Sequence, residues 1–377
     1  MKIQLIYIFA LLIIGKMKHI FKFIALAVLL TVSATSCNRK NDRETFSENI
    51  YARLFSIHGD TIEIGKEKYI LYPKDSTEAL KRSPYHLPYP VESVVCMSTN
   101  YISYFKLLEA ADYIDGVASA DLIYDSSIRE KVKAGKIYDV GFENALDYEK
   151  IMKARPDLVI TYTIDGYDSS YITRLRELGI KVIAITEYLE NHPLGKLEYL
   201  KLFGKLIGKE GLADGIFTAK ENAYLSLADS IRQQTGDFKK VMMNIPVQGN
   251  WYIPGGASYM SLLMKDAGGE IAGAIPGKAA SSTMNLEEAI ILAAGCDLWM
   301  NPHTFTSLEE LGKSNPLFKG LPMFEKGQVF NNTARMNEFG GNDFWENGSV
   351  YPELVLRDLN DIINGRYDRL VFHMKLK

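Results

Sequence analysis

The chain has 377 residues, of which 47% are apolar and 24% are charged, with a formal charge of −3. Its first 36 residues hold four lysines and no acid, so the remaining 341 carry 39 bases against 46 acids, a formal charge of −7. This composition excludes a disordered, collagen-like or coiled-coil chain. The sequence has no basic stripe, which argues against nucleic acid as a partner. Six histidines and three cysteines exclude a metal-rich or disulfide-dense protein.

The amino terminus is typical of a secreted protein. Two apolar runs, 3–15 and 23–32, are each shorter than the roughly 20 residues that cross a bilayer as a helix. The second run follows a basic segment that starts at Met17, and it leads to small residues before Cys37. A basic start, a short apolar run and small residues at a cleavage site indicate a signal peptide over residues 1–36.

The segment Ala34-Thr35-Ser36-Cys37 resembles the lipobox of bacterial lipoproteins, in which the cysteine becomes the acylated first residue. Ala34 takes the place of the usual leucine. We therefore predict lipidation at Cys37, with a plain cleaved signal and an uncleaved membrane anchor as the alternatives. Because Met17 begins a complete signal, residues 1–16 can be an over-extended start.

Two short segments precede the main body. Residues 37–50 are polar and charged, and we expect them to be a lipidated tether. Residues 51–90 alternate apolar and polar side chains around the turn His58-Gly59-Asp60, which predicts a small β-hairpin extension. A proline-rich link at 84–90 ends this extension.

From Glu92 onward, short apolar runs alternate with helical patterns. The first expected strands are 93–97, 116–119, 158–161 and 182–185, and the helices between them are 102–110, 148–154 and 171–178. The later elements are expected at 241–245, 258–267, 285–294, 297–301 and 329–331, with a final helix at 351–363. Such alternation indicates mostly parallel sheets with helices on both faces. We predict an N-terminal α/β lobe over 91–193 and a C-terminal α/β lobe over 237–377.

Residues 194–236 break this rhythm and are predicted to be the helical link between the lobes. The part from 212 to 234 contains no proline, and a helix of that length spans about 35 Å, enough to run along both lobes. A continuous helix resists the backbone rotation that a loop hinge absorbs. We therefore expect little relative movement of the two lobes.

The common catalytic and nucleotide-binding motifs are missing from the sequence. At Gly277-Lys278-Ala279 the phosphate-loop pattern fails, because no Ser or Thr follows Lys278 and Ala272 replaces the first glycine. Neither a dinucleotide fingerprint nor a nucleophile elbow occurs, and no two histidines are close enough to form a local metal pair. Cys96 and Cys296 lie in apolar runs and are expected to be buried thiols. Together these observations disfavour an enzyme.

Several stretches carry a family resemblance by their order and spacing. In the first lobe they are Val91–Thr99, Val140-Gly141-Phe142, Asp147-Tyr148-Glu149-Lys150-Ile151 and Lys153–Ile160. In the second lobe they are Asn285-Leu286-Glu287-Glu288-Ala289, Cys296-Asp297-Leu298-Trp299, Thr333–Asn337 and Gly340–Glu346. The chain resembles the substrate-binding proteins of ATP-dependent importers for ferric siderophores, haem and cobalamin, in a version common in Bacteroidetes lipoproteins. The resemblance runs from about residue 45 to the end.

The resemblance implies two Rossmann-like α/β lobes joined by one long α-helix, the class III arrangement of periplasmic binding proteins. It implies a monomer without enzymatic activity or an intrinsic cofactor, lipid-anchored on the periplasmic side of a membrane. Its partners would be a metal chelate and an ABC permease with its ATPase.

Such folds bind their ligand in the cleft between the lobes, at the carboxyl ends of the strands. Aromatic side chains suit a large or polycyclic ligand, because they bury much area at little entropic cost. Trp251 and Tyr252 are the strongest aromatic candidates, since we expect them in a loop directly after a strand. The residues predicted to contact ligand are Tyr101, Tyr124, Phe142, Tyr162, Trp251, Tyr252, His303, Arg335, Phe344 and Trp345.

The charges in the predicted cleft loops discriminate among ligands. Only Arg335 and Lys278 are basic there, against the acids Asp121, Asp125, Glu143, Asp165 and Asp168. An anionic catecholate complex would require several arginines, so a neutral chelate such as a hydroxamate complex or cobalamin is favoured. Arg335 has a loop-stabilising salt bridge as its alternative role. His303 can ligate haem iron or cobalt, or serve as a structural donor.

Glu149 and Glu287 are the predicted permease-docking acids, because the resemblance implies one acid near the start of a helix in each lobe. Two charges at a fixed spacing orient an encounter and raise its rate. The alternatives are ordinary helix-start carboxylates and, for the second lobe, docking by the adjacent Glu288. At the level of the whole protein, the alternatives to an importer component are a chelate scavenger without a permease and a bilobed metal-dependent enzyme.

Overall fold

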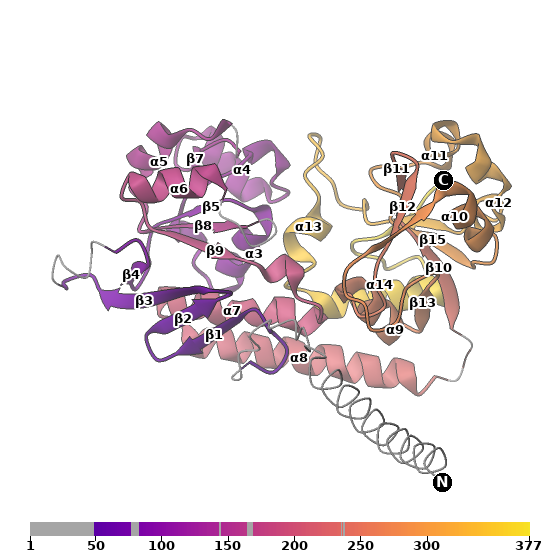
Figure 1. Cartoon of the computed structure of the whole chain (residues 1–377), viewed down its shortest axis with the longest axis horizontal. Coiled ribbons are helices and arrows are strands. Elements are labelled where there is room, and N and C mark those ends of the chain that lie inside the picture. The colour runs from indigo at the N-terminus through magenta and orange to yellow at the C-terminus, as the bar shows by residue number, and fades with distance from the viewer. Residues whose placement is uncertain (1–48, 77–82, 143–144, 164–168, 235, 237) are drawn as a thin grey trace, which may run out of the picture. The chain divides into compact units, whose positions relative to one another are not determined.

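The structure is a computed structural model that describes residues 49–76, 83–142, 145–163, 169–234, 236 and 238–377. The predicted signal peptide, Cys37 and almost all of the tether lie outside these residues. The described chain forms two α/β lobes, a small sheet that precedes the first lobe, and one long helix along both lobes (Figure 1). Among the described helices, none combines the length and the apolar character needed to cross a bilayer.

The small sheet precedes the first lobe and is larger than the expected hairpin. Its strands are β1 (Phe55–His58), β2 (Thr61–Ile64), β3 (Glu67–Pro73) and β4 (His86–Tyr89), in that spatial order. The first three are antiparallel, and β4 pairs in parallel with β3. The residues expected as a proline-rich link therefore supply the fourth strand, and Pro88 lies on an edge strand, where a missing N–H is tolerated.

The first lobe is built on a five-stranded parallel sheet with the order β7-β6-β5-β8-β9. Its strands are β5 (Val94–Cys96), β6 (Ile114–Val117), β7 (Tyr138–Asp139), β8 (Leu158–Tyr162) and β9 (Val182–Ile185). Its helices are α3 (Thr99–Leu107), α4 (Ser126–Lys133), α5 (Tyr148–Ala154) and α6 (Ser170–Glu177). Strands β5 and β9 are buried along their whole length and β6 and β8 along most of it, as expected when helices cover both faces of a parallel sheet.

The second lobe has a five-stranded sheet with the order β13-β10-β15-β16-β17, parallel except for β17. The strands are β10 (Lys239–Met243), β13 (Gly269–Ile271), β15 (Leu298–Met300), β16 (Val329–Asn331) and β17 (Met374–Lys375). The helices are α9 (Tyr259–Asp266), α10 (Leu286–Ala293), α11 (Leu308–Ser314), α12 (Pro322–Glu325), α13 (Asp343–Asn347) and α14 (Pro352–Ile363). Cys96 and Cys296 are buried free thiols, one in each lobe, as predicted.

A separate antiparallel sheet corrects one prediction in this lobe. It consists of β11 (Pro246–Val247), β12 (Asn250–Ile253) and β14 (Ser282–Asn285), with β12 in the middle. Trp251 and Tyr252 therefore lie in a strand, not in a loop. Because neighbouring side chains of a strand point to opposite faces, Trp251 is buried while Tyr252 is exposed.

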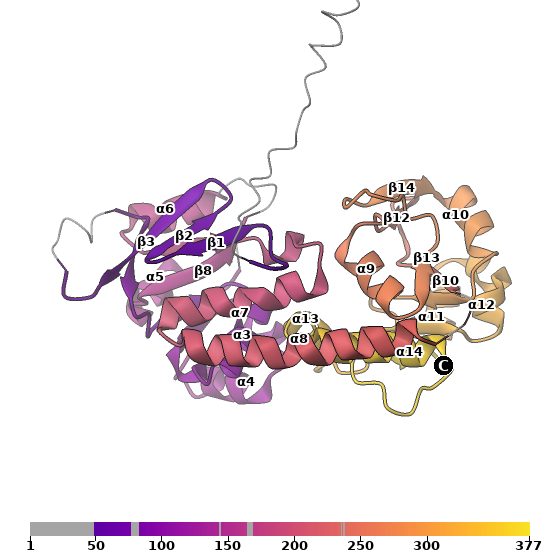
Figure 2. The same cartoon turned by 90° about the horizontal axis from the view of Figure 1, so that it is seen from below.

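The predicted link over residues 194–236 contains two helices, and the second of them is the one long helix that joins the lobes. Helix α7 (Pro193–Ile207) ends at Gly208, whose φ of 70° is a left-handed conformation that favours glycine, and α8 (Glu210–Arg232) follows. Figure 2 shows α8 running past both lobes. It packs against α7 of the first half and α14 of the second, and Lys220 of α8 pairs with Glu353 of α14 at 2.8 Å.

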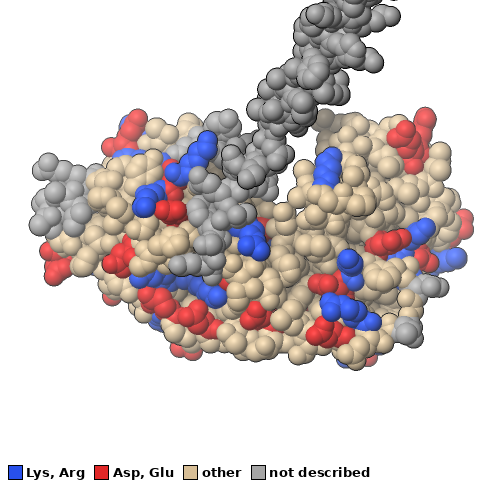
Figure 3. Space-filling view, turned by 60° about the horizontal axis from the view of Figure 1, so that its bottom comes forward, with Lys and Arg blue, Asp and Glu red and all other residues tan. Residues whose placement is uncertain are grey.

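The face turned forward in Figure 3 carries basic and acidic side chains interspersed with each other. No single-sign stripe gathers on that face, which agrees with the charge balance of the sequence.

Two buried carboxylates hold the amino-terminal segment of the described chain against the start of α7. Glu198 of α7 accepts hydrogen bonds from the backbone N–H groups of residues 50–52 at 3.1, 2.9 and 2.8 Å. Glu190 accepts from the N–H groups of Arg53 at 2.8 Å and Leu54 at 2.9 Å. Five consecutive amides thus end on two side chains that are almost completely buried. We refer to residues 50–54 with Glu190 and Glu198 as the amino-terminal clamp.

The clamp makes the stability of the fold depend on pH. Burial raises the pKa of Glu190 to about 7, although the amides of Arg53 and Leu54 oppose this shift. Between its ordinary pKa and about 7, the folded chain binds a proton that the unfolded chain does not, so the free energy of unfolding from this group falls as pH rises. Burial also lowers the pKa of His192, which acts in the opposite direction at acid pH.

We expect Glu190→Gln to remove this contribution, because glutamine keeps an acceptor oxygen and cannot ionise. The free energy of unfolding in urea, measured for both proteins at pH 5, 6, 7 and 8, should differ between them by a pH-dependent amount on the order of 2 kcal/mol across the window. The effect of His192 cancels in that difference. Parallel pH profiles would show that Glu190 does not titrate in this range.

Candidate functional site

The site lies between the lobes, where the carboxyl ends of β5, β6 and β8 face those of β10, β15 and β16. Two cavities occupy this cleft. The first, which we call the N-lobe chamber, has a volume of about 300 Å³ and is lined by Met97, Ser98, Thr99, Ala118, Ser119, Leu122, Phe142 and Tyr162. The second, the C-lobe chamber, has a volume of about 390 Å³ and is lined by Asn244, Ile245, Val247, Tyr252, Asn301, His303, Thr304, Asn332, Thr333 and Met336. Both are also lined by Gly340, Asn342 and Trp345, and the N-lobe chamber by Gly341.

The structure brings five of the predicted ligand-contacting residues into these chambers. Phe142 and Tyr162 line the N-lobe chamber, and Tyr252 and His303 line the C-lobe chamber. Trp345 lines both, and it is 63% exposed, against 45% for Phe142 and Tyr252. Exposed aromatic rings of this kind leave large apolar faces available to a bound molecule.

Three other predicted residues are core side chains, so their predicted ligand contacts are corrected by the structure. Tyr101 is fully buried beside Phe203 and donates its hydroxyl to the carbonyl of Thr161. Trp251 is fully buried against Trp299 and Phe318, with its indole N–H on the carbonyl oxygen of Met243.

Phe344 is the third of these core residues. It is 5% exposed and packs edge-on against Phe372 and His373. All three rings are buried in the interior, and for Trp251 and Phe344 the next residue in the chain, Tyr252 or Trp345, lines a chamber.

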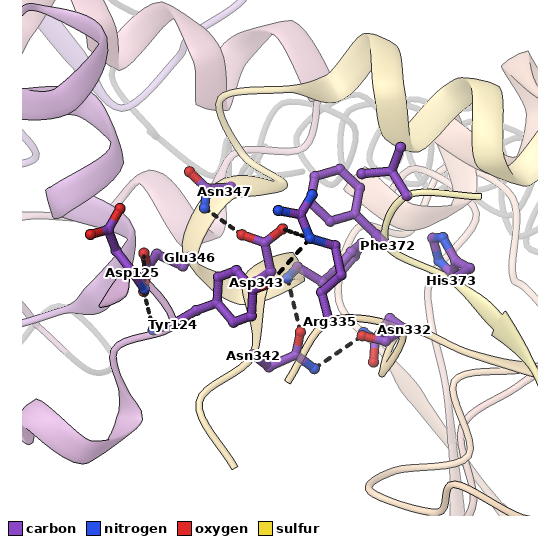
Figure 4. A network of polar contacts seen from close by, with 12 residues as sticks. Tyr124, Asp125, Asn332, Arg335, Asn342, Asp343, Glu346, Asn347, Phe372 and His373 are labelled. Atoms are coloured by element: carbon purple, nitrogen blue, oxygen red, sulfur yellow. Dashed lines mark hydrogen bonds and ion pairs between the residues drawn. The ribbon is translucent and has the colours of Figure 1, made fainter. Parts of the chain in front are cut away.

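Tyr124 and Arg335 belong to a polar network that joins the lobes (Figure 4). The Nε of Arg335 lies 3.1 Å from Asp343 Oδ2 and 3.3 Å from the hydroxyl oxygen of Tyr124, and the guanidinium lies over the Tyr124 ring. Arg335 therefore makes the salt bridge that was its alternative role. Neither residue lines a chamber in this structure.

The same network contains a segment, residues 335–347, that we call the inter-lobe strap. It belongs in sequence to the C-terminal lobe and bonds to the N-terminal one. Glu346, at the strap's far end, accepts hydrogen bonds from the backbone N–H groups of Tyr124 at 2.6 Å and Asp125 at 3.1 Å (Figure 4). Burial raises the pKa of Glu346 to about 7 despite these two bonds, and the nearby acids Asp125 and Asp343 act in the same direction as burial.

Sequence reasoning missed the polar lining of the C-lobe chamber. Asn244, Asn301 and Asn332 each come directly after a parallel strand, namely β10, β15 and β16. The position after a strand is where cleft side chains are expected in this type of sheet, so this signal was present in the sequence. Asn342 adds a fourth carboxamide from the strap.

Two features of this lining point to a bound molecule. The Oδ1 atom of Asn301 and the Oγ1 atom of Thr333 are buried without a hydrogen-bond partner in the described structure, and buried polar atoms are rarely left unpaired. Asn244, Asn301 and His303 also have positive φ angles of 65°, 55° and 55°. Backbone strain of this kind in residues other than glycine gathers at functional sites.

Neither chamber is lined by a charged side chain among the described residues. Glu143, Asp165 and Asp168, which were counted as cleft acids, lie outside the described residues. The described part of the chain also contains no cluster of three or more His, Cys, Asp or Glu side chains placed to hold a metal ion. The described lining can donate and accept hydrogen bonds and stack on rings, and it presents no cation to pair with an anionic ligand.

The predicted docking acids occupy equivalent positions in the two lobes. Helix α5 begins after Asp147, whose side chain accepts from the N–H of Lys150, and Glu149 is its second residue. Helix α10 begins after Asn285, whose side chain accepts from the N–H of Glu288, and Glu287 is its second residue. The helix caps therefore align Glu149 with Glu287 rather than with Glu288. Glu149 also pairs with Lys153 at 2.9 Å.

The fold and this cleft define a bilobed solute-binding protein. A family model described as periplasmic binding protein matches residues 94–335, well over half of the chain. The chain therefore belongs to the periplasmic binding protein family. Like its solved structural neighbours, it is a binding protein and not an enzyme.

Two curated relatives are similar over most of this chain. It is 24% identical over 358 residues to the iron(3+)-hydroxamate-binding protein FhuD of Bacillus subtilis, which covers 93% of this chain and 90% of that protein. It is 26% identical over 285 residues to an uncharacterized lipoprotein of Methanocaldococcus jannaschii, which covers 73% of this chain. The match spans 66% of the length of that lipoprotein.

Solved structures share the fold at lower identity. A periplasmic haem-binding protein from Pseudomonas aeruginosa matches with a TM-score of 0.56 and 16% identity, over 76% of this chain and 98% of that one. The triscatecholate siderophore-binding protein FeuA of Bacillus subtilis matches with a TM-score of 0.55 and 18% identity, over 74% of this chain and 95% of that one. The fold is thus shared by a haem-binding protein and a triscatecholate siderophore-binding protein, so the ligand has to be inferred from the lining of the cleft.

The tryptophans provide a direct test of the chamber assignment. The chain has three, and Trp251 and Trp299 are fully buried while Trp345 is exposed in the cleft. We expect Trp345→Phe to remove most of the fluorescence that acrylamide can quench, because acrylamide reaches only exposed indoles. A Stern–Volmer slope that stays unchanged in the variant would place one of the other two tryptophans at the surface.

Proposed function

We propose that this chain is the solute-binding component of an ABC importer and that it captures an uncharged ferric chelate of the hydroxamate type. The observation that carries the proposal is the lining of the two chambers, which consists of carboxamides, hydroxyls and aromatic rings without a described charge. A hydroxamate complex presents carbonyl and amide edges that such side chains bind. The similarity to an iron(3+)-hydroxamate-binding protein supports the same class.

Charge provides the sharpest test of the ligand class. Titration calorimetry with ferrichrome, a neutral ferric trihydroxamate, should give an affinity at least on the order of 100-fold higher than with the trianionic ferric complex of a triscatecholate. The reason is that burying charge without a partner costs several kcal/mol. Equal or reversed affinities would contradict the neutral-chelate assignment.

Haem and cobalamin form the second candidate class, and His303 is the observation that favours them. Its ring lines the C-lobe chamber, and its Nδ1 lies 3.1 Å from the hydroxyl of Thr304. The Nε2 atom is then the one placed to ligate iron or cobalt. In the same calorimetry, tight binding of haem or cobalamin that is lost in His303→Ala would favour this class over hydroxamates.

We further propose that Glu149 and Glu287 dock the protein on its permease. Each acid projects from the first turn of a helix, and each has an exposed apolar neighbour about one turn later. These neighbours are Met152, which is 47% exposed, and Ile291, which is 77% exposed. An acid beside an exposed apolar side chain suits a protein contact better than an isolated charge does. Cys37 would anchor the protein in the membrane through its lipid, on the periplasmic side.

Reversing the two acids separates an importer component from a scavenger. We expect the double variant Glu149→Lys, Glu287→Lys to lose uptake of radiolabelled ferric chelate in cells that lack the wild-type copy. The reason is that the two new lysines would face permease groups of the same charge. Its affinity for the chelate should stay within about twofold of wild type, since both acids lie outside the chambers.

The matched control is Glu288→Lys, which changes the same charge one residue away on the same helix. Uptake should survive in this variant. Unimpaired uptake in the double variant would favour a scavenger that passes its ligand to a different partner.

A further inference from the structure

The inter-lobe strap contains a closed hairpin in its middle. Met336 and Asn342 form an antiparallel bridge, and the N–H of Asn337 donates to the carbonyl of Gly341 at 2.8 Å. The Oδ1 atom of Asn337 accepts from the N–H groups of Phe339 at 2.9 Å and Gly341 at 2.7 Å. This loop therefore keeps its shape through its own hydrogen bonds.

The other end of the same side chain fastens the hairpin to the N-terminal lobe. The Nδ2 group of Asn337 donates to the carbonyls of Asp121 and Ile123, both at 2.8 Å. A carboxamide can accept two and donate two hydrogen bonds, and Asn337 makes all four. Its two acceptor bonds are inside the strap and its two donor bonds cross between the lobes.

Two more contacts hold the strap against the N-terminal lobe. A Cβ atom on Gly341 would lie 2.6 Å from the carbonyl oxygen of Leu122, so only glycine permits this close approach. At the other end, Ser103 donates its hydroxyl to the carbonyl of Glu346 at 2.6 Å, next to the two amides that the Glu346 carboxylate accepts. The strap is thus fixed on both sides of Trp345.

The position of Trp345 follows from these anchors. Its indole, together with Gly340 and Asn342, is common to the walls of both chambers.

The two chambers differ in the chemistry of their linings. The C-lobe chamber presents carboxamides and unpartnered acceptor atoms, whereas the N-lobe chamber presents Phe142, Tyr162 and the start of α3.

We propose that the strap is a fixed partition that divides the cleft into two chambers and selects a ligand with two uncharged arms that meet across the indole of Trp345. This inference rests on the proposed function and deepens it, because it names the shape of chelate that the site takes. A chelate small enough for one chamber makes little use of the partition. A larger one that reaches into both is bound on the two faces of the strap.

Two neutral ferric hydroxamates of different size test the inference. Ferrichrome is a trihydroxamate on a cyclic peptide, and iron(III) tris(acetohydroxamate) has the same coordination without the peptide. Trp345→Ala should weaken ferrichrome binding about tenfold through the loss of the ring contact, and change the affinity for the compact complex by less than about twofold. The control is Phe339→Ala, which removes an exposed ring of the same strap that lines neither chamber.

Substitutions of Asn337 test the partition without changing the walls of the chambers, because Asn337 lines neither chamber. Asn337→Ala removes all four bonds, while Asn337→Asp keeps the acceptors inside the hairpin and loses the two donors to the N-terminal lobe. If the crossing bonds position the strap, both variants should lower the ratio of the ferrichrome affinity to the compact-complex affinity by about the same factor. Thermal unfolding of each variant identifies any that fail to fold.

The outcomes separate the inference from the function on which it rests. If wild type binds neither complex, the hydroxamate assignment fails. If wild type binds both and Trp345→Ala weakens them equally or not at all, the partition fails and the function stands. An Asn337→Asp variant with the wild-type affinity ratio would also overturn the positioning role of the strap.

Discussion

Buried carboxylates that accept runs of consecutive backbone amides hold the parts of this fold together. Glu198 and Glu190 bind residues 50–54, Glu346 binds residues 124 and 125, and Asp358 binds the amides of residues 371–373. The three glutamates are distant in sequence from the amides that they bind, whereas Asp358 is close in sequence to its own. A buried carboxylate without such partners would be strongly unfavourable, and so would a buried run of unpaired amides. Each therefore requires the other, and this requirement determines where a segment docks.

The two lobes are connected at two levels. Helix α8 passes along both lobes with α7 packed beside it, and the strap crosses between the lobes at the cleft itself. A helix pair alone would permit a twist about its axis, whereas a second connection on the other side opposes it. The strap also lines both ligand chambers, so the element that bonds the two lobes together at the cleft is the element that shapes the site.

The sequence predicts the lobes, the order of their elements and the region of the cleft, because buried parallel strands and their helices have periodic apolar patterns. It predicts the orientation of individual aromatic side chains less well. Tyr252 and Trp251 are adjacent and face opposite sides of β12. This strand is defined by its antiparallel pairing with β11 and β14. The role of Asn337 could not be predicted, since two of its four bonds reach a lobe more than 200 residues away in the chain. Asn244, Asn301 and Asn332 could have been predicted from their place after a strand.

The amino-terminal clamp has a mechanical consequence. It fixes residues 50–52 to Glu198 of α7 and residues 53 and 54 to Glu190, which comes just before that helix. A force applied at residue 50 would therefore act first on the hydrogen bonds to Glu198, whose helix packs against α8, and only then on strand β1 of the small sheet.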